Sequence, residues 1–227
     1  MEGYLPIEWA IAWTIIAFPI VAYGVYRLSK ITKEHPEAKP LLALMGAFIF
    51  ILSALKLPSV FASSSHPTGS GLAAVIFGPG VASVLSMIVL VFQALLLAHG
   101  GLTTLGANTL SMGIIGPAIA FGVWIIGRKA RLPTSAVVFV AVALSDFGTY
   151  VVTAAQLAFA VPIAGTVFDS FIAFGAIYAV TQIPLAIGEA LLAVLLFDFL
   201  VKYKGKLLSS MKVIKLPSLG MEKEVNP

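Results

Sequence analysis

Six long apolar segments decide what this 227-residue chain can fold into. They lie at about residues 7–28, 40–57, 80–97, 107–127, 134–158 and 167–201. An α-helix needs about 20 such residues to cross a bilayer, whereas a strand of a membrane barrel needs only about 10. Charged residues make up 11% of the chain, less than half of their share in a soluble domain, so they cannot cover a soluble surface. The sequence therefore predicts an all-α, polytopic helical bundle in the cell membrane.

The positions of the basic residues predict how this bundle is oriented. The net charge of +4 does not indicate nucleic-acid binding, because Lys and Arg are gathered in short loops beside the apolar segments. The basic stretches, which we expect on the cytoplasmic side, are 27–39, 128–132 and the tail after residue 201. The loops without Lys or Arg, which we expect outside, are 57–71, 98–107 and 158–168. This pattern places the N-terminus outside and the C-terminus inside.

A conflict within this pattern predicts a re-entrant segment. If residues 72–97 formed one ordinary span, the basic loop 128–132 would lie outside. The conflict disappears if a short element, Gly71–Phe77, dips inward, the Gly78-Pro79-Gly80 break reverses the chain, and a helix over 81–97 returns outward. We therefore expect seven helical elements. The last one is a single long helix, which we expect to be kinked near Pro184.

The chain divides into one transmembrane domain, residues 1–201, and a short basic tail, residues 202–227. It has no cysteine, which excludes disulfides and thiolate metal sites. It contains no G-x-x-x-x-G-K-[ST], H-E-x-x-H or G-x-S-x-G motif. We therefore expect no ATP site in this chain and no catalytic function.

Two histidines lie in the loops that this topology places outside. His66 follows three serines in SSSHPTG, and His99 lies in LLAHGGLTTLGANT. Neutral imidazole is a common protein ligand for Co, Ni, Cu and Zn. A loop histidine also serves simply to cap a helix or to face water, so the residues alone leave both roles open. His35 lies among charges in KEHPEAKP, where we expect it to be solvated.

Other polar residues accompany the two histidines. Thr104 and Asn108 precede or begin an apolar helix, so either residue is a candidate cap, and Asn108 is also a candidate to hold a ligand or orient a histidine. Gln93 is either an interhelical hydrogen-bonding residue or part of the same network. Buried carboxylates are costly, so Asp146 and Glu189 indicate either a functional role or a structural pair bonded to neighbours such as Tyr150 or Gln182.

Three functions are compatible with these residues. The first is a metal-binding transport component without its own ATPase. The second is a solitary ion-coupled carrier in which Asp146 or Glu189 relays protons. The third is an intramembrane enzyme or assembly factor that uses His66 and His99.

Four stretches of the sequence carry a resemblance that separates these functions. They are EGYLP at 2–6, SSSHPTGSG at 63–71, FQALLLAHGGLTTLGANTLSMGIIGP at 92–117 and QIPLAIGEALL at 182–192. From Glu2 to about Val201 the chain resembles the CbiM/NikM family, the substrate-binding membrane components of energy-coupling-factor transporters for cobalt and nickel. The resemblance implies a six-helix core with an added N-terminal helix.

The resemblance also implies a site and partners. The metal is bound by the extreme N-terminus, here Met1, together with His66, and all-nitrogen sites suit Ni(II), Cu(II) and Co(II). The residues expected around that site are His99, Asn108, Gln93 and Thr104. The implied partners are a transmembrane coupling subunit, two cytoplasmic ATPases and often a small accessory membrane protein. Ala43 and Ala47 form a small-xxx-small face suited to the coupling subunit.

Cobalt, supplied for cobalamin biosynthesis, is the expected substrate, because the central motifs resemble the cobalt branch slightly better. Nickel is the alternative. Family members begin Met-His-Ile or close to it, whereas this sequence opens with MEGYLP and lacks the histidine in second position. We therefore expect a few true N-terminal residues to precede Met1, which is a ligand only if it is the true N-terminus.

Overall fold

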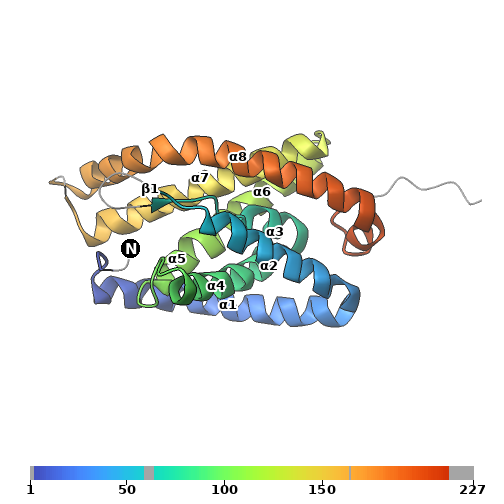
Figure 1. Ribbon diagram of the computed structural model, residues 1–227, viewed down its shortest axis with the longest axis horizontal. Coiled ribbons are helices and arrows are strands. Elements are labelled where there is room, and N and C mark those ends of the chain that lie inside the picture. Colours follow the sequence, from blue (N-terminus) through green and yellow to red (C-terminus); the bar gives the residue numbers. More distant parts are fainter. Residues whose placement is uncertain (1–2, 59–63, 164, 215–227) are drawn as a thin grey trace, which may run out of the picture.

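The computed structural model describes residues 3–58, 64–163 and 165–214, and its helices lie side by side along one long axis (Figure 1). The elements are α1 (Ile7–Glu34), η1 (Pro36–Ala38), α2 (Lys39–Ala54), β1 (Leu57–Pro58), β2 (Ser64–Ser65), α3 (Ser70–Phe77), α4 (Pro79–Leu96), α5 (Leu105–Asn108), η2 (Thr109–Ile115), α6 (Gly116–Lys129), α7 (Thr134–Ala160) and α8 (Val167–Ser210). α5, η2 and α6 follow one another without a break, so the described chain contains seven helices, as the sequence predicts. Six of them are long and apolar enough to cross a membrane, which confirms a multi-pass, all-α membrane protein.

The re-entrant hairpin predicted from the charge pattern is present. α3 is eight residues long and buried throughout, and Gly78 reverses the chain into α4. Gly78 has a φ of +84°, a backbone conformation that residues with a side chain rarely adopt. α1 packs closely against the start of α4, because a Cβ added to Gly24 would lie 2.2 Å from the carbonyl oxygen of Gly80.

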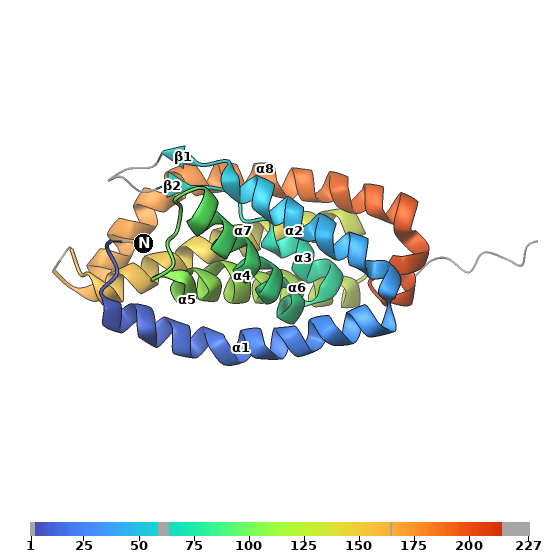
Figure 2. The same ribbon diagram turned by 60° about the horizontal axis from the view of Figure 1, so that its bottom comes forward.

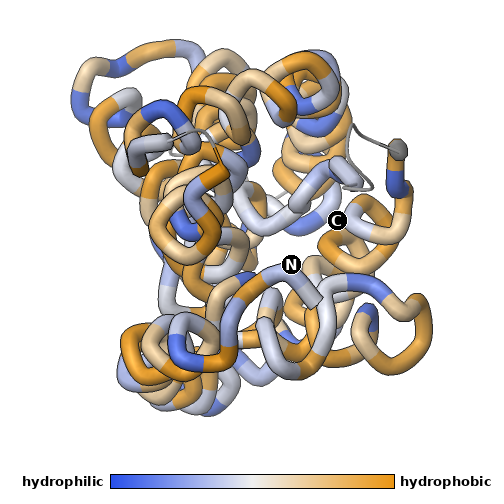
Figure 3. Tube along the Cα trace, turned by 90° about the vertical axis from the view of Figure 1, so that its left-hand side faces the viewer, coloured by the Kyte–Doolittle hydropathy of each residue, from blue (hydrophilic) through white to orange (hydrophobic). Residues whose placement is uncertain are grey.

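The core lies around α3, at the centre of the bundle. Its fully buried side chains include Met45 and Ile49 of α2, Leu72 of α3 and Phe197 of α8. Other apolar side chains face outward, such as Val180, which is 75% exposed. Hydrophobic residues therefore occur around the whole outer side of the bundle, as the end-on view shows (Figure 3). Such a surface suits contact with lipid. α1 runs along the outside of the bundle over its full length (Figure 2).

The last helix differs in detail from the prediction. α8 is continuous over 44 residues and includes the first nine residues of the segment that we expected to be the basic tail. Within α8 the backbone departs from helical angles at Lys204, with φ −126° and ψ 19°, and not at Pro184, where we expected a kink. A proline is accommodated here without a break, because a transmembrane helix can satisfy the freed carbonyl locally.

Candidate functional site

A cavity of about 260 Å³ lies at the end of the bundle where the loops before α3 and after α4 meet. Both predicted histidines line it, although they are 33 positions apart in the sequence. The other polar residues at its wall include Ser64, Asn108, Ser111 and Tyr150. The tertiary structure thus brings the HPTG loop, the HGGLTT loop and the π-helical segment η2 to one place. π-helical segments occur frequently at functional sites.

His66 and His99 face each other across this cavity. Their ring centroids are 5.0 Å apart and their planes are inclined by 76°. Burial lowers the pKa of His66, and burial followed by the charge of the neighbouring His66 lowers the pKa of His99 to about 4. Both rings are therefore neutral at pH 7, which is the state in which imidazole binds a metal ion.

The geometry around His66 determines which ring nitrogen is free. Nδ1 of His66 lies 2.9 Å from the carbonyl oxygen of Pro67. A carbonyl oxygen can only accept a hydrogen bond, so Nδ1 carries the proton and donates it. Nε2 then keeps its lone pair, and a backbone carbonyl on the other ring nitrogen is the usual support of a metal-binding histidine.

Tyr150 of α7 and Gln182 of α8 hold the backbone of His66. The hydroxyl of Tyr150 accepts a hydrogen bond from the His66 amide at 2.9 Å and donates one to the His66 carbonyl oxygen at 3.1 Å. Nε2 of Gln182 also donates to that carbonyl oxygen, at 3.3 Å. The sequence analysis considered Tyr150 and Gln182 only as partners of the carboxylates. Tyr150 follows Asp146 by four positions, so the helical spacing already placed them on one face.

The two intramembrane carboxylates lie directly beneath this loop. Glu189 accepts hydrogen bonds from the amides of Thr68, at 2.5 Å, and Gly69, at 2.9 Å. Asp146 accepts a hydrogen bond from Gln182 and lies close enough to Glu189 for the two carboxyl groups to interact. The predicted pair, with its bond to Gln182, is thus present. In addition, Glu189 fixes the start of α3, which the sequence analysis did not foresee.

The loop that carries His99 has an unusual backbone. Ala98, Gly100 and Gly101 have φ values of +46°, +83° and +92°. Thr104 donates a hydrogen bond to the Gly100 carbonyl oxygen at 2.6 Å, and Asn108 donates to the Thr104 hydroxyl at 3.3 Å. Thr104 occupies the cap position of α5 but makes no side-chain cap bond, so the predicted capping role is wrong for this residue. Its hydroxyl instead closes the loop on the cavity.

Gln93 contributes to the site through its backbone. Its side chain donates to Ser53 of α2, which is the interhelical alternative of the sequence analysis. Its carbonyl oxygen accepts hydrogen bonds from the amides of Leu97, at 3.0 Å, and His99, at 3.2 Å. Lys56 donates to the Leu97 carbonyl oxygen at 3.1 Å and so ties the same loop to α2. Gln93 thus supports the position of His99 without reaching the cavity with its side chain.

The remaining candidates lie elsewhere. Met1 is outside the described residues. His35 is at the opposite end of the bundle, 3.4 Å from Glu37. Ala43 and Ala47 line an apolar groove between α2 and α4. Among the described residues no group of three or more His, Asp or Glu side chains is arranged to hold a metal ion. The histidine pair therefore supplies the metal-binding chemistry of this part of the chain.

Comparison with known proteins gives consistent matches over the length of the chain. The family model CbiM, described as the cobalt uptake substrate-specific transmembrane region, matches residues 1–207. The cobalt transport protein CbiM of Carboxydothermus hydrogenoformans is 52% identical over 204 residues, which cover 90% of this chain and 83% of that protein. The cobalt transport protein CbiM of Nostoc sp. is 52% identical over 223 residues, which cover 98% and 85%.

The fold is also similar to a solved structure. The crystal structure of a transition metal transporter matches with a TM-score of 0.78 over 90% of this chain and 92% of that chain, at 22% sequence identity. At this level of identity the match supports the arrangement of the helices and says nothing about individual residues.

Proposed function

This chain belongs to the CbiM family of cobalt uptake transmembrane regions, and from this premise we propose that it is the membrane component that binds cobalt(II) for uptake into the cell. The observation that carries the proposal is the buried, neutral His66. Its Nδ1 is bonded to the Pro67 carbonyl oxygen, so its Nε2 is free as a ligand in the cavity.

The ligand set follows from the chemistry of these residues. His66 contributes the imidazole nitrogen, and His99 lies beside it as part of the surrounding shell with Asn108 and Thr104. Nitrogen donors of this kind suit Co(II) and Ni(II), so nickel is the second candidate substrate. The family resemblance adds the N-terminal amine to the set, and Met1 provides it only if the protein begins there.

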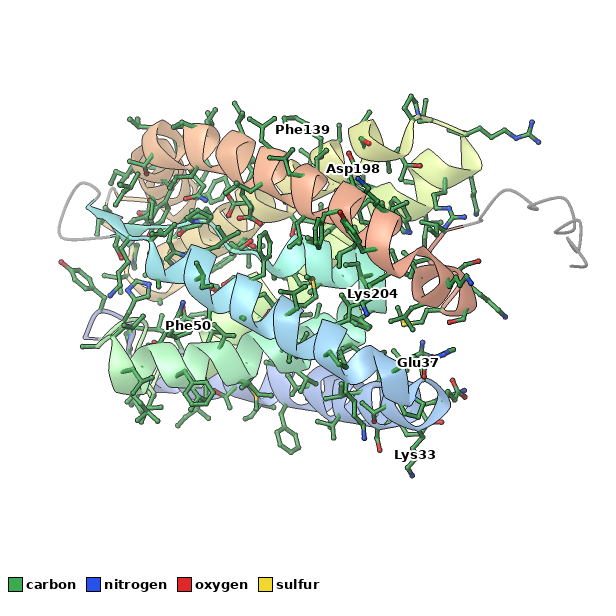
Figure 4. All side chains as sticks on the ribbon, turned by 45° about the vertical axis from the view of Figure 1, so that its right-hand side comes forward. Lys33, Glu37, Phe50, Phe139, Asp198 and Lys204 are labelled. Carbon is green, nitrogen blue, oxygen red and sulfur yellow. The ribbon has the colours of Figure 1, made fainter. Side chains whose placement is uncertain are left out.

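The energy for transport is proposed to come from partner subunits. The sequence contains no P-loop motif, so ATP hydrolysis is assigned to two cytoplasmic ATPases that act through a transmembrane coupling subunit. A small accessory membrane protein is a further proposed partner. The apolar groove of about 420 Å³ between α2 and α4 supports this assignment, because Ala43, Gly46 and Ala47 leave room for a close helix contact. Phe50 lies in the same groove between the two helices (Figure 4).

Metal analysis of the purified protein tests the substrate. Cells that express the full chain are grown with equal cobalt and nickel, and the metal content of the protein is measured. We expect cobalt in the wild type and none in His66→Ala, whereas His35→Ala, a matched histidine at the other end of the bundle, should retain it. Nickel alone in the wild type would replace cobalt as the substrate. Retained cobalt uptake by His66→Ala would contradict the proposed site.

A second measurement separates the ATP-driven transporter from a solitary carrier. The buried pair Asp146 and Glu189 is the observation that supports a carrier with a proton relay. We expect cobalt uptake only in cells that also contain the coupling and ATPase subunits. Uptake by the chain alone, abolished by Asp146→Asn, would favour the carrier.

A further inference from the structure

A second and larger cavity lies at the other end of the bundle. Its volume is about 610 Å³, and it is separated from the histidine pair by the length of α4, 18 residues or about 27 Å. Its floor is apolar and is formed by Val75, Ile76 and Phe77 of α3 with Phe121 and Ile125 of α6. The reversal at Gly78 is part of its wall.

Basic side chains from three separate segments form the rim of this cavity. They are Arg27 and Lys30 of α1, Arg128 and Lys129 of α6, and Lys212 after α8. The carboxylate at the rim, Glu34, lies 3.7 Å from Lys30. Among the described residues, Arg27, Arg128, Lys129 and Lys212 have no carboxylate within ion-pair distance. The rim therefore carries a concentrated positive charge over a hollow.

The fold fixes two of these cations in place. The backbone turns back at Lys212, where φ is +62°, and the Val213 amide bonds to the Leu208 carbonyl oxygen at 2.9 Å. Arg128 donates to the Val213 carbonyl oxygen, and its guanidinium group lies 5.4 Å from the centre of the Trp124 ring. The side chain of Val213 is buried. Lys212 is thus held over the cavity by an anchored turn.

Membrane orientation alone does not account for this arrangement. The positive-inside rule requires basic residues at one end of the bundle, but it does not require them to surround an apolar hollow. Arg131 and Lys33 satisfy the rule from outside the cavity, and Lys33 points away from the bundle (Figure 4).

We propose that this cavity binds the phosphate group of an anionic phospholipid headgroup. Arg and Lys bind phosphate through charge-assisted hydrogen bonds, and Arg does so with two parallel donors. The apolar floor favours a lipid over free phosphate, because it accepts the glycerol end and first methylene groups of an acyl chain. Basic pockets between transmembrane helices are known binding sites of such headgroups. This site is independent of the cobalt site, since it shares no residue with it.

The test uses the full chain in detergent and measures its thermal unfolding midpoint. Phosphatidylglycerol, phosphatidylcholine and inorganic phosphate are added separately at low salt. We expect phosphatidylglycerol to raise the midpoint of the wild type by about 4 °C more than phosphatidylcholine does. The double variant Arg27→Gln/Lys212→Gln should lose at least half of this difference, while the matched control Lys33→Gln/Arg131→Gln should keep it.

Each other outcome has a defined meaning. Equal stabilisation by both lipids, or an equal effect of phosphatidylglycerol on both double variants, would overturn the proposal. Inorganic phosphate as effective as phosphatidylglycerol would keep the phosphate chemistry and overturn the lipid as its source. If lipid binding is unchanged but the Arg27→Gln/Lys212→Gln variant fails to assemble with its partner subunits, the cavity takes an acidic protein segment and the proposal is wrong.

Discussion

The hydrogen bonds of His66 are specific enough to predict the effect of single atoms. The hydroxyl of Tyr150 satisfies both the amide and the carbonyl oxygen of His66, inside a buried loop. A residue without that hydroxyl leaves the amide unpaired, and an unsatisfied buried polar group costs about 1–3 kcal/mol. The position of the free Nε2 depends on this clamp.

Tyr150→Phe should therefore weaken cobalt binding by about tenfold, because about 1.4 kcal/mol of loop positioning is lost. Cobalt titration of the purified protein measures the change. Tyr178→Phe is the control: its ring lies 5.2 Å from that of Tyr150, but among the described residues its hydroxyl makes no hydrogen bond to the His66 loop. Equal effects of both variants would show that ring packing, and not the hydroxyl, positions His66.

Burial of the two histidines also predicts a pH dependence of stability. In the unfolded chain a histidine takes up a proton near pH 6.5, whereas the folded protein holds the pKa of His99 at about 4 and that of His66 below its usual value. The unfolded state therefore binds more protons below pH 6.5, and the metal-free protein should become less stable as the pH falls from about 6.5 to 4.

The measurement is the unfolding midpoint of the metal-free protein between pH 7.5 and 5. His99→Gln removes one of the two groups, so its midpoint should fall less steeply over that range than that of the wild type. A steeper fall, or a midpoint that rises on acidification, would contradict the assigned neutral state of His99.

At the scale of elements, the re-entrant hairpin depends on close backbone packing. α3 and α4 reverse at Gly78, and the start of α4 lies against Gly24 of α1 with no room for a side chain. The added methyl group of Gly24→Ala would meet the carbonyl oxygen of Gly80, which is backbone and cannot rotate away. Separation of α1 from the hairpin is the only relief.

Gly24→Ala should lower the free energy of unfolding by about 2 kcal/mol or more, in the range of an overpacked core. Gly122→Ala is the matched control, since a Cβ at Gly122 of α6 would meet nothing within 4 Å and alanine favours a helix by about 0.5–1 kcal/mol. Thermal unfolding in detergent compares the two. A neutral Gly24→Ala would show that α1 shifts without cost.

At the scale of the whole molecule, the two cavities lie at opposite ends of the bundle and so predict its orientation. The histidine loops should face outside and the basic rim the cytoplasm. Cysteine introduced at Ser64 or Thr103, in a chain that has none, should react with an impermeant thiol reagent in intact cells. Cysteine at Lys33 should react only after the membrane is opened. The reverse pattern would invert the topology and the direction of transport proposed here.

The sequence by itself determined the class of the molecule, the number of helices and the hairpin. The thickness of the bilayer sets the length of each apolar segment, and the basic loops at residues 27–39 and 128–132 set the parity of crossings. Because both signals depend on composition along the chain, they are readable without any knowledge of packing. His66 and the loop of His99 were identified in the same way, as polar stretches between apolar ones.

Only the tertiary structure decided which way individual side chains face. In a membrane helix the lipid-facing and core-facing sides are both apolar, so the sequence has no amphipathic stripe that fixes the rotation of the helix about its axis. For this reason Gln93 was placed in the metal network, although its side chain turns to Ser53. For the same reason the contact of Glu189 with the amides of Thr68 and Gly69, more than 100 positions away, was not predicted. The rotation of α8 places that carboxylate under the loop of His66, and packing of the whole bundle fixes the rotation.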